Sequence, residues 1–336
     1  NCIYSPDVVS FAREKGYFDG VNKDFSFANA YAPLDFGARR YCEARVWSYF
    51  NMFTARGNEF LPYILGDTDT PMPLFVKPDR KISVQDVKNA MRDHYEGTPL
   101  DISKDFGAGP YHTPYRLSPL SFKVGDKEYF NERPISTQQS GFVFVAQMRS
   151  TLPDAIGGVL WFGTDDANMT VFTPVYCCTD KVPVCYSRVD GADYITFSWN
   201  SSFWIFNWVS NMVYPRYDLM IGDVRATQNE LETTFNEAQE GIESAAAKLL
   251  EKDPAKAKAF LTNYTNMTAQ SAFDTWKRLG EFIIVKYNDG VVRKMKDGKF
   301  ERNAIGQPAG VVRPGYPKEF LEEYVKQTGD RYKMPD

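Results

Sequence analysis

Three apolar runs follow one another between Ser140 and Tyr176: Gly141-Phe-Val-Phe-Val-Ala-Gln-Met-Arg149, Gly157-Gly-Val-Leu-Trp-Phe162 and Val171-Phe-Thr-Pro-Val-Tyr176. Their β-branched and aromatic residues suit the pleated surface of a strand. Short polar stretches at 150–153 and 164–168 separate the runs. We therefore predict an antiparallel meander of three strands at the centre of the molecule.

Pro174 restricts where the third strand can lie in this sheet. Proline has no N–H to donate to a neighbouring strand, so the third strand should lie at an edge or end near Pro174. The runs are continuously apolar instead of alternating with polar residues. This pattern predicts that both faces of the sheet are covered.

Composition limits the classes of protein that fit. The hydrophobic share of 43% suffices for a large core. The length of 336 residues favours about two domains. The net charge is −4 with both signs interspersed, so no basic stripe suits nucleic acid. No apolar run approaches the roughly 20 residues of a membrane-spanning helix.

Helices are expected both before and after the meander along the chain. One carries Arg39 to Phe50, with Arg40 and Arg45 well separated around its axis, so that one arginine can face inward. Ser83 caps another helix, which breaks at Gly97. Further helices are predicted at 203–214 and 230–252, after the Asp253 cap, and at about 269–280.

Two more strands are predicted in the second half of the chain. Tyr194 to Trp199 is one, and Phe282-Ile-Ile-Val-Lys-Tyr287 is the other. Asn288-Asp-Gly290 follows the latter directly and predicts a hairpin turn.

Several standard catalytic signatures are missing. The chain has two histidines, His94 and His112, and no C-x-x-C or H-E-x-x-H spacing, which disfavours a zinc site. It also lacks a nucleophile elbow, a Walker loop and a dinucleotide-binding glycine motif. We expect no metal and no cofactor.

Asp93-His94-Tyr-Glu96 is a candidate acid–base and substrate-binding cluster. A histidine between two carboxylates has its charged form stabilised near neutral pH. The alternative is a helix C-terminus whose histidine interacts with the last carbonyl groups.

The five cysteines offer few nucleophiles. Cys2 would need a free α-amine as its base, but Asn1 precedes it, so its nitrogen is an amide. Cys42 fits a small core residue of a helix. Cys177, Cys178 and Cys185 share one loop, where either a disulfide involving Cys185 or free thiols are compatible with the sequence.

Eight strings spread along the chain resemble the dipeptidase A family of cysteine dipeptidases, in the same order. They are Ser5-Pro-Asp-Val-Val-Ser-Phe-Ala-Arg-Glu-Lys-Gly-Tyr17, Phe25-Ser-Phe-Ala-Asn-Ala-Tyr-Ala-Pro33, Arg40-Tyr-Cys-Glu-Ala-Arg-Val-Trp-Ser48, Met91-Arg-Asp-His-Tyr-Glu-Gly-Thr-Pro99, Gln147-Met-Arg-Ser-Thr-Leu-Pro153, Gly158-Val-Leu-Trp161, Phe172-Thr-Pro-Val-Tyr176 and Ser198-Trp-Asn-Ser-Ser-Phe-Trp-Ile-Phe-Asn207. The resemblance covers nearly the whole chain and includes several rare combinations of aromatic and charged residues.

The resemblance implies an α+β fold, the four-layer αββα sandwich of N-terminal nucleophile hydrolases. Residues 1–222 would form part of the catalytic domain, with long loop insertions at 55–135. Residues 223–336 would form a helical C-terminal region with a terminal hairpin, packed on the same domain. The implied activity is the hydrolysis of dipeptides through a thioester on a terminal cysteine.

One departure from the family concerns the nucleophile itself. In the family, Cys-Thr-Thr opens the mature chain, followed by more than a hundred residues before the part that resembles Asn1 onward. The chain therefore resembles the downstream portion of such an enzyme, inactive without the upstream segment. Neither the nucleophile nor the oxyanion-stabilising asparagine can be assigned to a residue here.

Related bile-salt and penicillin amidases have an arginine near the nucleophile. Arg45 and Arg40 are the candidates for this catalytic role, in which a guanidinium would hold the thiolate or the substrate carboxylate. The alternative for Arg45 is a salt bridge with Glu43 on the same helix surface.

The implied partners are a dipeptide substrate and an upstream segment or chain that carries the N-terminal cysteine, with a homo-oligomer left open. A second hypothesis is a non-catalytic binding or structural module of the same fold. A third is a self-contained thiol enzyme that uses Cys2 or Cys42 with His94. The cysteine-rich loop favours an exported bacterial protein over a cytoplasmic one.

Overall fold

The structure is a computed structural model that describes residues 3–335, and it consists of two compact units. Unit 1 comprises Asn1–Lys81 and Leu117–Arg133, and unit 2 comprises Ile82–Arg116 and Pro134–Asp336. Both helices and strands are present, which is compatible with an α+β class. The four-layer sandwich and the domains 1–222 and 223–336 stay predictions.

Unit 1 is mostly helical. Its longest helix begins where the sequence predicted one, but Arg39–Glu43 forms a π-helical turn between the α-helical segments. The buried face of this helix contains Ala44, Trp47 and Ser48. The elements of unit 1 are α1 Val8–Glu14, α2 Phe27–Tyr31, α3 Phe36–Ala38, α4 Ala44–Phe53, α5 Leu61–Leu65 and the hairpin β1 Ser121–Val124 with β2 Lys127–Phe130.

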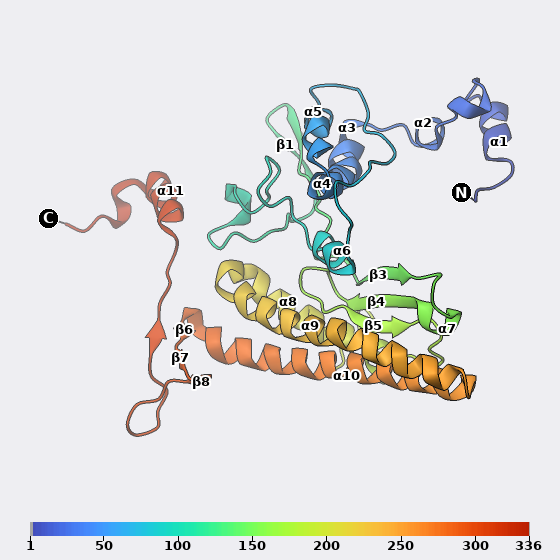
Figure 1. Cartoon of the computed structure of the whole chain (residues 1–336). Coiled ribbons are helices and arrows are strands. Elements are labelled where there is room, and N and C mark those ends of the chain that lie inside the picture. Colours follow the sequence, from blue (N-terminus) through green and yellow to red (C-terminus); the bar gives the residue numbers. More distant parts are fainter. Residues whose placement is uncertain (1–2, 336) are drawn as a thin grey trace. The chain divides into compact units, whose positions relative to one another are not determined.

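Unit 2 contains the predicted meander, and helices α6 to α10 contact its strands (Figure 1). The meander consists of β3 Phe142–Met148, β4 Gly158–Thr164 and β5 Thr173–Tyr176, paired antiparallel in the order β3-β4-β5. The other elements are α6 Val84–Ala90, α7 Asp154–Gly157, α8 Ser202–Val213, α9 Tyr217–Leu250, α10 Pro254–Tyr287, α11 Lys318–Thr328 and the short strands β6 Val292–Arg293, β7 Met295–Lys296, β8 Lys299–Phe300 and β9 Val311–Val312.

The register of the sheet confirms the place of Pro174. Trp161 of β4 lies opposite Val145 of β3 and Pro174 of β5, so the proline-containing strand is an edge strand. Trp161 is fully buried, and the long helices α9 and α10 run side by side against the sheet (Figure 1). Phe206 of α8 stacks on Trp276 of α10 at 4.7 Å in the same core.

The prediction that both faces of the sheet are covered is wrong for β3. Its residues alternate, with Val143 and Val145 buried while Phe142, Phe144 and Met148 are exposed. The physical reason is that β3 is the other edge strand, and only its inner face packs against helix α6.

The predictions of two additional strands are also wrong. Tyr194 to Trp199 forms a loop with one isolated bridge between Asp193 and Thr196. The segment 282–287 is the last part of α10, a single helix that includes the separately predicted helices after Asp253. Packing overrides strand propensity there, because Ile283 and Tyr287 are buried on the helix face that contacts the rest of unit 2. The predicted hairpin turn at Asn288–Gly290 is a single 3-10 turn.

The long helices are not membrane spans. Among residues 3–335, no helix combines the length and the apolar character needed to cross a bilayer.

Candidate active site

The loop that follows α6 carries the predicted acid–base residues. Ser83 and Asp86 begin α6 with a reciprocal capping box, and the helix ends at Ala90, earlier than the predicted break at Gly97. Beyond it, the Glu96 carboxylate accepts the backbone N–H of His94 at 2.7 Å and lies 2.9 Å from Nδ1 of the same residue. His94 is 1% exposed, whereas the Glu96 side chain is 53% exposed.

Tyr95 connects these two residues in a strained conformation. Its φ is +67°, and its side chain is fully buried. A positive φ is uncommon for a bulky residue and costs on the order of 1–3 kcal/mol. The turn that results folds Glu96 back onto His94.

Electrostatics fixes the charge of Glu96. Partial burial opposes its ionisation, but the hydrogen bonds and the charge of His94 outweigh this effect and lower the pKa of Glu96 to about 2. The carboxylate is therefore anionic throughout the physiological pH range, and its exposed side can accept a cationic group. On the other side of the imidazole, Nε2 of His94 is buried and has no hydrogen-bond partner among the described residues.

Sequence reasoning missed two buried acids next to this pair. Asp166 lies immediately beyond β4 and accepts hydrogen bonds from the Tyr214 hydroxyl at 2.7 Å and the Met169 N–H at 3.0 Å. Burial raises the pKa of Asp166, while the Tyr214 hydrogen bond and the charge of His94 lower it. The structure therefore places His94 within electrostatic range of Asp166. Asp93 joins the same region through its carbonyl, which accepts the Ser136 N–H at 3.1 Å.

Asp165 is the second missed acid. It is fully buried with a φ of +69°, and its Oδ1 accepts a hydrogen bond from Asn207 at 3.1 Å. Its Oδ2 has no partner among the described residues. Burial, with the adjacent charge of Asp166, raises the pKa of Asp165 to about 8. The available signal was two consecutive aspartates directly after the mainly apolar strand β4, a place where buried carboxyl groups are unusual.

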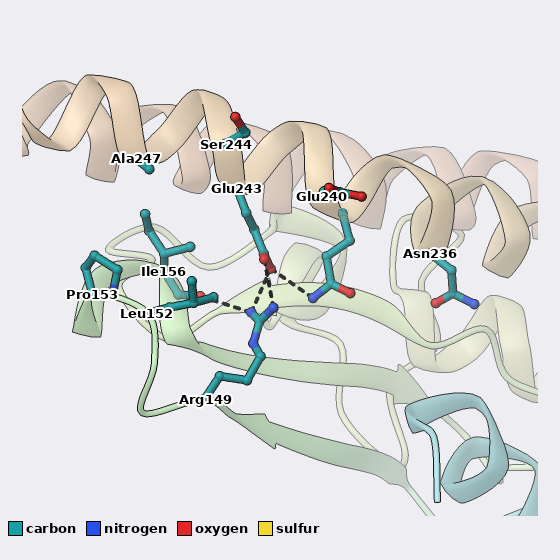
Figure 2. A pocket seen from close by; sticks show the side chains of 10 residues that line it. Arg149, Leu152, Pro153, Ile156, Asn236, Glu240, Glu243, Ser244 and Ala247 are labelled. Atoms are coloured by element: carbon teal, nitrogen blue, oxygen red, sulfur yellow. Dashed lines mark hydrogen bonds and ion pairs between the residues drawn. The ribbon is translucent and has the colours of Figure 1, made fainter. Parts of the chain in front are cut away.

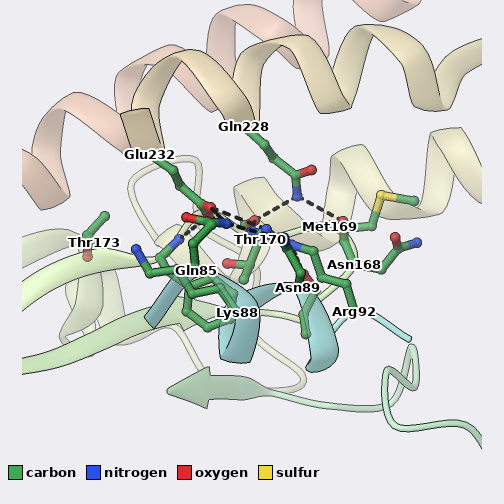
Figure 3. Close-up of polar contacts among 12 residues, drawn as sticks. Gln85, Lys88, Asn89, Arg92, Asn168, Met169, Thr170, Thr173, Gln228 and Glu232 are labelled. Atoms are coloured by element: carbon green, nitrogen blue, oxygen red, sulfur yellow. Dashed lines mark hydrogen bonds and ion pairs between the residues drawn. The ribbon is translucent and has the colours of Figure 1, made fainter. Parts of the chain in front are cut away.

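The segment that follows these acids is held by Arg92, just beyond the end of α6, and by side chains of α9 (Figure 3). Arg92 contacts both carboxylate oxygens of Glu232 at 2.5 and 3.2 Å and donates to the Ala167 carbonyl at 3.0 Å. Gln228 donates to the carbonyls of Asn168 and Thr170. These buried, charge-assisted bonds fix the acid-bearing segment in position.

Lys88 of α6 lies in the same network. It is fully buried, with Nζ 3.4 Å from the centroid of the Trp161 ring and 3.0 Å from Asn236. Burial lowers the pKa of Lys88 to about 7. A buried ammonium over an aromatic face is stabilised by the ring quadrupole, which partly offsets its desolvation.

The two predicted arginines belong to unit 1. Arg40 lies over the ring of Phe36, with 5.0 Å between the guanidinium carbon and the ring centroid. Arg45 forms no ion pair with Glu43 in the described part of the chain, and its Nε is buried without a hydrogen-bond partner there. Burying an unpaired polar group costs free energy, so the Nε of Arg45 would gain from an added hydrogen-bond acceptor.

A hollow of about 480 Å³ with a mainly apolar lining lies beside α7 and α9 (Figure 2). Its centre is an ion pair in which Arg149 contacts both oxygens of Glu243 at 2.6 and 2.7 Å. Arg149 also donates to the Ile156 carbonyl, and Glu243 accepts the Tyr176 hydroxyl. Because these charges satisfy each other, this arginine serves to attach α7 to α9.

Comparison with known protein families shows to which family the chain belongs. The family model described as peptidase family C69 matches residues 1–230. The chain is a member of peptidase family C69. This family consists of cysteine dipeptidases of the N-terminal nucleophile type, as the resemblance in the sequence predicted.

Curated relatives agree with the C69 assignment. The chain is 32% identical over 176 residues to a probable dipeptidase of Salmonella dublin, covering 52% of this chain and 35% of that protein. It is 24% identical over 277 residues to a probable dipeptidase B of Lactococcus lactis subsp. lactis, covering 80% and 50%. Dipeptidase A of Lactobacillus helveticus is 26% identical over 167 residues, covering 49% and 29%. The chain thus spans half the length or less of these relatives.

The C69 match includes the candidate residues of both units. Arg40, Arg45, the 93–96 loop and the buried acids at 165–166 all lie within residues 1–230. Helix α10 and the end of α9 lie outside the matched range.

Four thiols of this C69 chain lie in the described residues. They are all free cysteines: Cys42, Cys177, Cys178 and Cys185. Among these described residues, Cys185 therefore forms no disulfide. Burial raises the pKa of Cys178, and it raises that of Cys185 to about 12, so both are poor thiolates. Cys2 lies outside the described residues. No group of three or more His, Cys, Asp or Glu in residues 3–335 is arranged to hold a metal ion.

Proposed function

We propose that this chain is part of an enzyme that hydrolyses dipeptides through a cysteine nucleophile. The match to peptidase family C69 over residues 1–230 carries the proposal, and the names of its curated relatives supply the substrate class. Because burial raises the pKa of the Cys178 and Cys185 thiols, we further propose that the nucleophile belongs to a segment that is not among these residues. The chain then contributes framework and binding groups.

Arg45 is our candidate for the anion-binding residue of this reaction. A guanidinium can hold a thiolate or a peptide carboxylate with two parallel hydrogen bonds. Its buried, unpartnered Nε and the missing ion pair with Glu43 support this role over a purely structural one. Arg40 is the weaker candidate, because it packs on Phe36.

Asp93, His94 and Glu96 are proposed as substrate-binding residues of unit 2. Glu96 is the member that meets solvent, and its low pKa keeps it anionic. An exposed carboxylate held by a histidine suits the α-ammonium group of a peptide.

Arg45→Lys tests the arginine assignment in the natural polypeptide that contains these residues. Lysine keeps the charge but loses the planar pair of donors, so kcat/KM for a dipeptide should fall about tenfold or more, or roughly 1.4 kcal/mol of transition-state stabilisation. The melting temperature should remain nearly unchanged. Arg40→Lys is the matched control and should retain its activity.

The same pair of variants can reject the assignment. Loss of activity in Arg40→Lys with full activity in Arg45→Lys would transfer the role to Arg40. Full activity in both variants would remove both arginines from the reaction.

A further inference from the structure

A second hollow in unit 2, of about 550 Å³, lies between α8 and α10, away from the residues discussed so far. Trp199, Trp208, Lys277, Glu281 and Ile284 line it. The last three are spaced four and three residues apart on α10, so they lie on one face of that helix. The volume is within the range of small-molecule sites and can hold an amino acid or a dipeptide.

Two tryptophans form the apolar walls of this hollow. Their ring centroids are 5.1 Å apart and their planes are perpendicular, so the edge of one ring faces the plane of the other. Trp199 is 49% exposed and Ile284 44%, which is a large apolar area to leave in water. Gly280 makes this arrangement possible, because any side chain at this position would collide with the ring of Trp208.

The rim of the hollow carries one charge of each sign. The Lys277 ammonium lies 5.9 Å from the centroid of the Trp199 ring. Within residues 3–335, neither Lys277 nor Glu281 takes part in an ion pair, although they are one helical turn apart. A purely cationic ligand would be repelled by Lys277 and a purely anionic one by Glu281. A ligand with both charges can pair with both residues.

We propose that this hollow binds a zwitterion with an apolar side chain, either a free amino acid or a short peptide. The ammonium group pairs with Glu281, the carboxylate pairs with Lys277, and the side chain lies against Trp199 and Trp208. The inference does not rest on the proposed hydrolysis, because it concerns binding alone and its two charged residues lie outside the part matched to family C69.

Calorimetric titration of the 336-residue chain with L-leucine tests the proposal. L-leucinamide, which lacks the carboxylate, and N-acetyl-L-leucine, which lacks the ammonium group, are the matched probes. We expect saturable binding of leucine and about tenfold weaker binding of either analogue, the effect of one charged hydrogen bond. Leucine is a product that cannot be hydrolysed further, so failure of the dipeptidase assay would not affect this result.

Substitutions at the rim test which charged group of the ligand pairs with which residue. Lys277→Gln should weaken leucine about tenfold while leaving leucinamide unchanged, and Glu281→Gln should weaken leucine while leaving N-acetyl-leucine unchanged. Trp199→Ala should abolish detectable binding of leucine. Glu237→Gln and Lys248→Gln, exposed charges of α9 that do not line the hollow, are controls that should bind like the unmodified chain.

Three results would overturn the proposal. They are no heat of binding with leucine in the millimolar range, equal affinity for leucine and leucinamide, or unchanged leucine affinity in both rim variants. Melting curves of the variants show whether each is folded, and since all three side chains are partly or fully exposed we expect them to be.

Discussion

Val143→Asp should prevent the chain from folding. Val143 is 7% exposed on the inner face of β3, opposite Gly163 of β4. An aspartate there would be buried without a partner, which costs several kcal/mol, comparable with the whole stability of a typical domain. Circular dichroism and thermal melting would show loss of the cooperative transition.

The neighbouring residue provides the control. Phe144 is 49% exposed on the outer face of the same strand, so Phe144→Asp should shift the melting temperature only slightly. An unchanged melting temperature in Val143→Asp, or equal losses in both variants, would show that the inner face of β3 is not part of the core.

The second large effect concerns pH and Asp165. In the folded chain this carboxyl keeps its proton up to about pH 8, whereas unfolding returns it to an ordinary pKa near 3.8. Between these values the folded state binds more protons than the unfolded state, so the contribution of Asp165 to stability falls as the pH rises through this window. Asp165→Asn imitates the protonated form and does not titrate.

The difference in stability between Asp165→Asn and the unmodified chain should therefore grow with pH. It should be near zero at pH 4 and reach on the order of a few kcal/mol in favour of the variant at pH 8. Urea unfolding at a series of pH values measures it. Asp166→Asn is the contrast: the carboxylate accepts the Tyr214 hydroxyl and the Met169 N–H, so this variant should lose stability. A difference for Asp165→Asn that stays flat with pH would contradict a buried neutral carboxyl.

The sequence was sufficient to predict the meander, because its strands are continuous apolar runs separated by short turns. It did not predict the exposed face of β3, because the alternation of Phe142, Val143 and Phe144 is invisible when all three are apolar. The run Phe282 to Tyr287 was mistaken for a strand for a related reason. Its β-branched residues favour a strand locally, while helix packing of Ile283 and Tyr287 decides the outcome.

In the candidate site too, contacts between residues close in the sequence were predictable, and contacts between distant residues were not. The pairing of His94 with Glu96 is a contact between residues two apart, so a short motif revealed it. Asp165 and Asp166 looked like a polar turn, because their burial depends on α8 and on Tyr214, about 40 to 50 residues away along the chain. The π-helical turn at Arg39–Glu43 likewise shifts Arg40 relative to Arg45 in a way that no regular helical spacing predicts.

We propose that dipeptides are hydrolysed by a cysteine that is not among the cysteines of this chain. Alkylation with iodoacetamide, followed by mass mapping of the modified peptide in the natural polypeptide, tests it directly. We expect dipeptide hydrolysis to be lost as a terminal cysteine outside residues 1–336 is modified, and a dipeptide to slow that modification. Loss of hydrolysis that follows the alkylation of Cys2, Cys42, Cys177, Cys178 or Cys185 would show instead that the nucleophile is a cysteine of this chain.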